Sequence, residues 1–482
     1  MISRHFLKSS LIYSIFGALP LASSIILLPF YTNLLSTTDF GLLAIFISFT
    51  LLMQIFVNLS FDALVGIHYF ELKDNSEKLN AYISTVFISL IIIGAIFISI
   101  SFILGPPIFK WVFSGKIDFF PYGFMSIATA VFNSFFKTYT FLLINQQRPI
   151  RFLWMNLFNF ILTIAISIFG LYLYPQTLIG PMNGRLLSGV GIFLLTFLYV
   201  ISETGIVYKP RLLKGAIAFC APIVIYFSMS WLISYADRFI INYFDNPADV
   251  GVFDFSVKCT LLIDFALGGL ISAIYPKVYS IWKEQKINYS SPEVNKYFHS
   301  LSALNLLMIA LTILFIPLII PMVVTNKNYY LSFQFLPILS ISFITRALLN
   351  MYIAPVYFFK KTIILPKVFF ITAVFQFTIS FFMVKYFGLW GAVWAIALIK
   401  PIQLVMMWYE SNKIFKFSFN SMKLIFLPLA YCILVIATNY FLSGYNYYII
   451  NSFGLFIVCV LIFLVYRNEI FDSFSFIKKK YL

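Results

Sequence analysis

Basic side chains within apolar stretches are the residues of this sequence best suited to binding chemistry. They are Lys137, Arg185, Arg238, Lys258, Arg346 and Lys400. An arginine can hold a phosphate through two parallel hydrogen bonds, and a lysine attracts it as a point charge. Each base facing lipid at the centre of a bilayer would cost about 2.5–3.5 kcal/mol, so we expect these bases to face water or a partner. The pattern predicts an anion site, whose candidate substrate-binding residues are Lys137, Arg185, Arg346, Lys400 and Lys258.

Several charged residues in the same stretches have a second interpretation. Asp62 and Asp264 can bind a coupling proton or sodium ion, but they can equally pair with an interior base. Lys258 follows Asp254 by one helical turn, a spacing that allows an ordinary ion pair. For Arg238 a structural pairing is the favoured role. The candidates for ion coupling or structural pairing are Asp62, Asp237, Arg238 and Asp264.

Other reactive residues give no sign of catalysis or metal binding. The cysteines lie in apolar stretches and have no CxxC or Cys/His spacing; they are Cys220, Cys259, Cys432 and Cys459. The sequence contains three histidines and lacks the GxxxxGK[ST] loop of ATP-hydrolysing proteins. We therefore expect no catalytic residue, no metal and no cofactor, and we expect a protein that is not an enzyme.

The elements that position these residues are membrane-spanning helices. Of 482 residues, 61% are hydrophobic and only 10% are charged, which excludes a water-soluble protein. Apolar runs long enough to cross a bilayer predict about fourteen helices. They cover residues 9–31, 40–61, 81–104, 122–144, 152–171, 177–200, 216–243, 251–275, 301–324, 333–357, 363–384, 388–409, 424–442 and 447–466. The net charge of +16 is not gathered in a nucleic-acid-binding motif, so membrane lipids, and not nucleic acid, are the expected partners.

The distribution of basic residues between loops supports this number of spans. With fourteen spans, most of the 33 lysines and arginines fall in loops and tails on one face. The opposite loops carry only Lys110, Lys116, Lys327 and Lys385. Because basic loops favour the cytoplasm, both termini are predicted to be cytoplasmic.

The two halves of the chain repeat each other at an offset of about 210 residues. Asn33 matches Asn242, and Gly41 matches Gly251. An even number of spans per repeat predicts two six-helix lobes related by a pseudo-twofold axis along the membrane normal. The predicted boundaries are 1–205 for the first lobe, 206–415 for the second, and 416–482 for a final helix pair with a cytoplasmic tail. Lobes of this kind suit alternating access, with bases from both directed to one central space.

Three segments resemble a known family. They are Leu-Pro-Phe-Tyr-Thr-Asn-Leu-Leu-Ser-Thr-Thr-Asp-Phe-Gly-Leu-Leu at 28–43, Ala-Asp-Arg-Phe-Ile-Ile at 236–241 followed by Asp249-Val-Gly251, and Gly-Leu-Trp-Gly-Ala-Val-Trp-Ala at 388–395. They resemble polysaccharide-export flippases of the multidrug/oligosaccharidyl-lipid/polysaccharide superfamily. The resemblance implies a bacterial inner-membrane protein that translocates an undecaprenyl-pyrophosphate-linked oligosaccharide for O-antigen (lipopolysaccharide) or capsule. It also makes the polysaccharide polymerase machinery a candidate partner, and it places the lipid tail at the last two helices.

Three alternative functions remain open. A multidrug or cation antiporter of the same superfamily shares the architecture, but should present interior acids to its cargo. A peptidoglycan-precursor flippase carries functional bases in its first two helices, whereas residues 9–61 contain no lysine or arginine. A polysaccharide polymerase or ligase needs catalytic groups on a sizeable external loop, and the longest outer loop here is roughly 105–121.

Overall fold

The structure is a computed structural model that describes the chain except residues 1–11, 14, 286–288, 442–445 and 482. The described residues are helical throughout, apart from turns, loops and one isolated bridge between Tyr289 and Lys416. They form two compact units, residues 1–251 and 252–482. Each unit is described on its own below.

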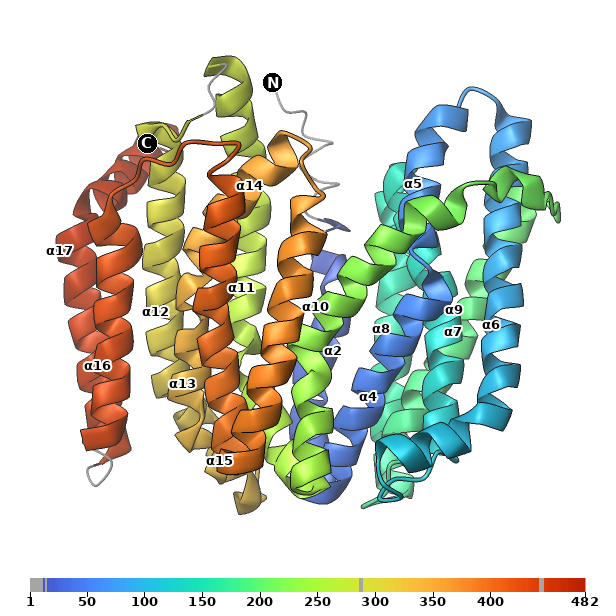
Figure 1. Ribbon diagram of the computed structural model, residues 1–482, viewed down its shortest axis with the longest axis horizontal. Coiled ribbons are helices and arrows are strands. Elements are labelled where there is room, and N and C mark those ends of the chain that lie inside the picture. The colour runs from blue at the N-terminus through green and yellow to red at the C-terminus, as the bar shows by residue number, and fades with distance from the viewer. Residues whose placement is uncertain (1–11, 14, 286–288, 442–445, 482) are drawn as a thin grey trace. The chain divides into compact units, whose positions relative to one another are not determined.

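The first unit is a bundle built around one central helix (Figure 1). Its elements are α2 (Leu19–Ile26), α3 (Leu28–Leu34), α4 (Thr37–Asn58), α5 (Phe61–Leu72), α6 (Ser76–Val112), α7 (Tyr122–Asn145), α8 (Pro149–Leu173), α9 (Ile179–Thr204), the 3-10 turn η1 (Pro210–Leu213) and α10 (Ala216–Phe244). Helix α7 contacts α4, α5, α6, α8 and α9. Small residues make this possible, because Ser126, Ala130 and Ser134 are almost completely buried where neighbouring helices approach α7.

A break divides the second predicted span of this unit into α4 and α5. Leu59 and Ser60 both adopt left-handed backbone conformations, with φ of 48° and 58°. Such conformations are uncommon for residues other than glycine, asparagine and aspartate. The break places Asp62 in the first turn of α5, where the partial positive charge of a helix N-terminus favours a carboxylate.

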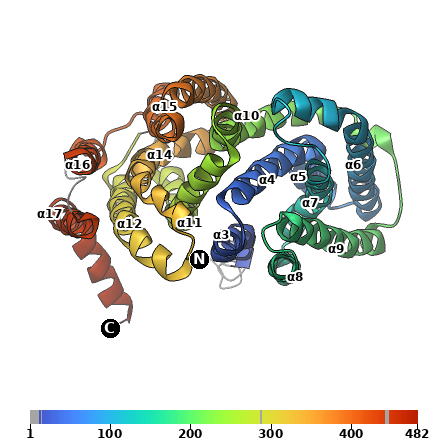
Figure 2. The same ribbon diagram turned by 90° about the horizontal axis from the view of Figure 1, so that it is seen from below.

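The second unit begins within α11 (Pro247–Gln285), whose first residues belong to the first unit. Its other elements are α12 (Pro292–Val323), the 3-10 helix η2 (Lys327–Gln334), α13 (Leu336–Ile341), the 3-10 turn η3 (Ser342–Thr345), α14 (Arg346–Phe358), α15 (Ile364–Ser411), the π-helical turn η4 (Met422–Phe426), α16 (Leu427–Phe441) and α17 (Tyr447–Tyr481). Helix α12 packs against α13, α14 and α17, while α15 packs against α13 and α14. Figure 2 shows α12 beside α17 and α14 beside α15.

The prediction of an all-helical membrane protein with about fourteen spans is confirmed. Twelve helices of the described chain are long and apolar enough to cross a membrane. One of them, Ile364–Ser411, contains two predicted spans and is interrupted at Gly388, whose φ of 55° and ψ of −136° are not helical. The remaining predicted span, 9–31, starts outside the described residues and continues as the shorter apolar helix Ala22–Leu34. The domain boundaries at 205 and 415 stay a prediction.

Candidate functional site: interior ion pairs and an unpaired arginine

The first unit holds an ion pair between α5 and α7. Lys137 Nζ lies 3.1 Å from Asp62 Oδ2. Asp62 is buried, and Lys137 also lies over the ring of Phe227, 5.1 Å from its centre. The second oxygen of Asp62 is buried without a hydrogen bond among the described residues. This carboxylate therefore neutralises Lys137 and keeps one free acceptor.

The second unit holds a corresponding pair between α14 and α11. Arg346 Nη2 lies 3.0 Å from Asp264 Oδ1. Arg346 occupies the middle of the apolar stretch Leu336–Phe358, at the point where η3 becomes α14. The irregular turn is stabilised by Asn305 Nδ2, which donates a 2.8 Å hydrogen bond to the carbonyl of Phe343. Arg346 Nε is buried and unpartnered among the described residues, so the guanidinium retains donors for another acceptor.

These two pairs occupy similar places in the repeat. Lys137 and Arg346 lie on the fourth predicted span of their halves, and each pairs with an acid next to or within the second predicted span of its half. Of the two interpretations of Asp62 and Asp264, the geometry supports pairing with an interior base. A pair of this kind can open, and the base then becomes available to an anionic ligand.

Arg185 differs from these bases because it has no acidic partner in the described part of the chain. Its side chain lies on α9, and its Nε is buried and makes no hydrogen bond with any residue that the structure describes. The neighbouring backbone is fixed by close packing of α9 on α8. A Cβ atom on Gly184 would lie 2.0 Å from Ser167 Oγ, and one on Gly180 would lie 2.5 Å from the carbonyl carbon of Gly170. The structure thus holds an uncompensated guanidinium on a rigid helix.

The other predicted site residues are in separate surroundings. Lys258 Nζ lies 2.8 Å from Asp254 Oδ2 on the same helix, as the spacing suggested. Arg238 is buried; it donates a 2.7 Å hydrogen bond to the carbonyl of Ser234 and lies over the ring of Tyr235. Asp237 is also buried. Asp237 and Lys400, which lies on α15, each have an interaction partner. Since Lys137 and Arg185 belong to the first unit while Arg346 and Lys400 belong to the second, their meeting at one ligand stays a prediction.

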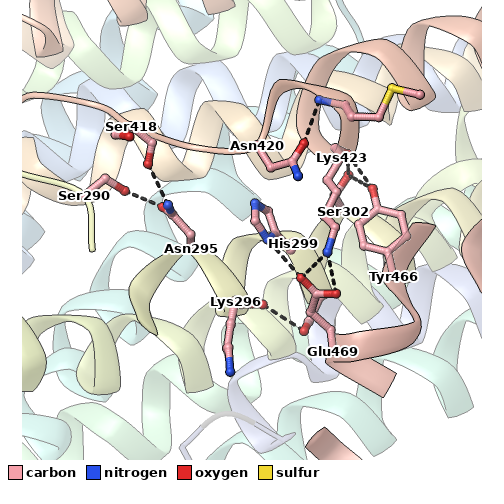
Figure 3. Close-up of polar contacts among 12 residues, drawn as sticks. Ser290, Asn295, Lys296, His299, Ser302, Ser418, Asn420, Lys423, Tyr466 and Glu469 are labelled. Carbon is pink, nitrogen blue, oxygen red and sulfur yellow. Dashed lines mark hydrogen bonds and ion pairs between the residues drawn. The ribbon is translucent and has the colours of Figure 1, made fainter. Parts of the chain in front are cut away.

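Sequence reasoning missed a buried polar cluster at one end of the second unit (Figure 3). Glu469 on α17 receives hydrogen bonds of 2.6 and 2.7 Å from Lys423 Nζ, and one of its oxygens lies 3.1 Å from His299 Nδ1 on α12. Tyr466 donates to the carbonyl of Lys423 and contacts the hydroxyl of Ser302 at 3.2 Å. These hydrogen bonds and ion pairs connect α12, η4 and α17 to one another. The available signal was an acid directly beyond the last predicted span, two residues after Arg467.

We expect Glu469→Gln to lower the stability of the second unit by about 1.5–3 kcal/mol, the usual contribution of a hydrogen bond to a charged group. Burial alone raises the pKa of the Glu469 carboxyl, but the hydrogen bonds and charge of Lys423 and the hydrogen bond with His299 bring this pKa below its ordinary value. The stabilisation is therefore complete above the unfolded pKa of about 4.3 and is lost as the pH falls through the lower folded pKa.

Thermal unfolding of the detergent-solubilised protein between pH 7 and pH 3 measures this effect. The gap in Tm between wild type and Glu469→Gln should close on acidification. Asp74→Asn, in the exposed loop after α5, is the matched control and should leave Tm at pH 7 unchanged. A gap that persists at pH 3 would contradict the assignment of this stability to the charged carboxylate.

Comparison with known proteins identifies the family. The family model described as "Polysaccharide biosynthesis protein" matches residues 6–282, more than half of the chain. The fold is similar to that of "Lipid II flippase MurJ, inward closed conformation", with a TM-score of 0.72 and 14% identity over 96% of this chain and 100% of that one. It is also similar to an inward-facing and an outward-facing multidrug resistance MATE family transporter of the MOP superfamily.

The inward-facing transporter gives a TM-score of 0.68 and 13% identity over 85% of this chain and 98% of that one. The outward-facing one gives 0.56 and 14% identity over 85% and 95%. At these identities the similarity concerns the fold, and none of the curated proteins compared with the chain matches it. The match over residues 6–282 shows that this chain belongs to the polysaccharide biosynthesis protein family.

Proposed function

We propose that this protein is a flippase for a lipid-linked oligosaccharide. The proposed cargo is an undecaprenyl-pyrophosphate-linked repeat unit of O-antigen or capsule. It would move from the cytoplasmic to the periplasmic leaflet of a bacterial inner membrane by alternating access, with both termini of the protein cytoplasmic. The observation that carries the proposal is Arg185, which lies on a membrane-spanning helix of a polysaccharide biosynthesis family member and has no acidic partner among the described residues. A pyrophosphate is an anion with oxygens spaced for such a guanidinium.

The ion pairs give this proposal a mechanism. Arg185 acts as a fixed contact for the pyrophosphate, while Lys137 and Arg346 exchange their carboxylate partners for its oxygens. After release of the cargo, Asp62 and Asp264 neutralise the two bases again. A bare charge in the membrane centre costs about 2.5–3.5 kcal/mol, so re-formed pairs make the return of the empty carrier easier. Lys400 and Lys258 are further candidates for contact with the head group.

A second candidate function is export of a cationic compound, which the similarity of the fold to multidrug transporters favours. In that case Asp62 and Asp264 would bind the cargo or a coupling ion. The finding that each of these acids already lies beside a base favours the anionic cargo. A polymerase or ligase is the third possibility, and the polymerase machinery is instead a candidate partner that receives the cargo.

A depletion strain separates these functions by the leaflet on which lipid-linked repeat units accumulate. A flippase predicts accumulation on the cytoplasmic leaflet and loss of surface polysaccharide. Accumulation on the outer leaflet would identify a polymerase or ligase. Unchanged polysaccharide together with increased sensitivity to cationic compounds would identify a multidrug antiporter.

In this strain, we expect Arg185→Gln to lower surface polysaccharide at least about tenfold. A hydrogen bond to a charged group is worth about 1.5–3 kcal/mol, and glutamine removes the charge but keeps much of the length. Arg185→Lys should retain part of the activity, because it keeps the charge and loses the paired donors. Arg211→Gln, at an exposed position of η1, is the control. Wild-type polysaccharide from Arg185→Gln at equal abundance would exclude Arg185 from the site.

A further inference from the structure

Two adjoining cavities of the first unit flank the start of α8. One, of about 370 Å³, is lined by polar side chains that include Asn80, Gln146, Arg148 and Glu203. The other, of about 560 Å³, is lined by Arg148, Arg151, Trp154 and Tyr199, among others. Arg148 borders both. The two cavities lie at the loop between α7 and α8, which the distribution of basic residues predicts to be cytoplasmic.

The charges at this place leave an excess of positive charge. Arg148 Nη1 lies 2.6 Å from Glu203 Oε1, and Arg151 Nη1 contacts the same oxygen. One carboxylate is thus shared by two guanidinium groups, whose side chains are 43% and 33% exposed. The Arg151 guanidinium also lies over the ring of Tyr199, 4.9 Å from its centre. A second anion at this position would complete the charge balance.

One buried polar atom beside the arginines lacks a partner. The side-chain oxygen of Gln146 makes no hydrogen bond among the described residues, although this residue lines the smaller cavity. Tyr139, which is only 1% exposed and lines the same cavity, instead interacts through its hydroxyl with Arg151. Buried polar groups are normally hydrogen-bonded, so the Gln146 oxygen indicates that a polar ligand group enters the cavity.

An apolar stripe leads away from the arginines along α8. Ile150, Trp154, Phe158 and Ile161 are 53%, 63%, 41% and 53% exposed, and their spacing places them on one helix face. In a membrane-spanning helix such a face is available to lipid chains, and tryptophan favours the boundary between hydrocarbon and water. The cationic end and the apolar stripe together match the two parts of a phospholipid.

We propose that this surface binds an anionic phospholipid, with its phosphate at Arg148 and Arg151 and an acyl chain along Ile150, Trp154 and Phe158. The polar part of the head group occupies the smaller cavity, beside Tyr139. This site lies at the surface of the first unit and is independent of the cargo proposed above. Binding at this site makes the protein sensitive to the lipid composition of the leaflet in which the site lies.

The test measures quenching of Trp154 by brominated lipids in nanodiscs that contain the full chain. Because the chain has seven tryptophans, Trp154→Phe defines the part of the signal that comes from Trp154. Brominated phosphatidylglycerol is titrated into phosphatidylcholine, and brominated phosphatidylcholine is the neutral comparison. We expect Trp154 to be quenched by phosphatidylglycerol at a mole fraction at which the neutral lipid has little effect.

The variant R148Q/R151Q should weaken the preference for phosphatidylglycerol about twenty-five-fold, at about fivefold for each basic residue near the membrane surface. Glu203→Gln removes the competing carboxylate and should strengthen the preference, which keeps the test informative if the double variant folds poorly. The matched control is R211Q/K214Q, which removes two exposed charges near η1.

Three results would overturn the proposal. The first is an unchanged preference in R148Q/R151Q. The second is an equal loss in R211Q/K214Q, which would mean that the attraction is diffuse. The third is displacement of phosphatidylglycerol by inorganic phosphate alone, which would identify the ligand as a free anion. Persistence of the lipid signal in inorganic phosphate supports the lipid assignment.

Discussion

Replacement of Gly41 by alanine is expected to lower the stability and the abundance of the folded protein strongly. A Cβ atom at Gly41 would lie 1.7 Å from the carbonyl oxygen of Pro247, and a Cβ atom at Gly251 would lie 2.2 Å from that of Thr37. These obstacles are backbone atoms, so no change of rotamer relieves the clash. Overpacking of a rigid site costs about 1–3 kcal/mol and occasionally more, and this contact lies at the upper end.

The measurements are Tm and surface polysaccharide for Gly41→Ala, Gly251→Ala and the double variant. Because both glycines serve one contact, the effects should not add. Gly268→Ala is the control on α11, where a new Cβ meets nothing within 4 Å. It should be neutral or stabilise the helix by up to about 1 kcal/mol. Normal stability of Gly41→Ala would contradict the packing of these two helix starts.

Replacement of Arg346 by glutamine is expected to lower transport about a hundredfold. This effect is larger than the loss of at least about tenfold expected for Arg185→Gln. The change removes a candidate ligand for the pyrophosphate, and it also leaves Asp264 uncompensated. An unpaired charge in the centre of a membrane costs about 2.5–3.5 kcal/mol. Asp264→Asn alone leaves Arg346 unpaired and should also reduce protein abundance.

The double variant D264N/R346Q separates pairing from binding. Without either charge, the two side chains can still hydrogen-bond, so abundance should return to the wild-type level. Transport should stay low if Arg346 contacts the cargo. Full recovery of surface polysaccharide would restrict Arg346 to a structural role. The same cycle with D62N/K137Q tests the first unit, where Lys137 and Asp62 form the corresponding pair.

The membrane-spanning helices could be predicted because their signal is local. Apolar length and the distribution of basic loops placed a helix in each predicted segment. The pair between Lys258 and Asp254 was also accessible, since one helical turn separates them. The interior bases of the two halves could be identified as a class from the sequence. The role of the acids Asp62 and Asp264 stayed open between binding a coupling ion and pairing with one of these bases.

The partners themselves depend on which helix faces meet, and no local pattern records this. Asp62 reaches Lys137 because the helix breaks at Leu59 and Ser60, and neither residue is a glycine or a proline that would have marked a break. Glu203 and Glu469 were overlooked for a similar reason. They lie outside the apolar cores, and their partners come from other helices.

The fastening of α17 to α12 and η4 by Glu469 and Tyr466 has a consequence for how the protein moves. The last two helices move together with the rest of the second unit. Separation of α17 from α12 would first have to break the ion pair of a buried carboxylate with its cationic neighbour. The distance between probes attached to α12 and α17 should then stay constant through a full transport cycle, even while other distances in the protein change.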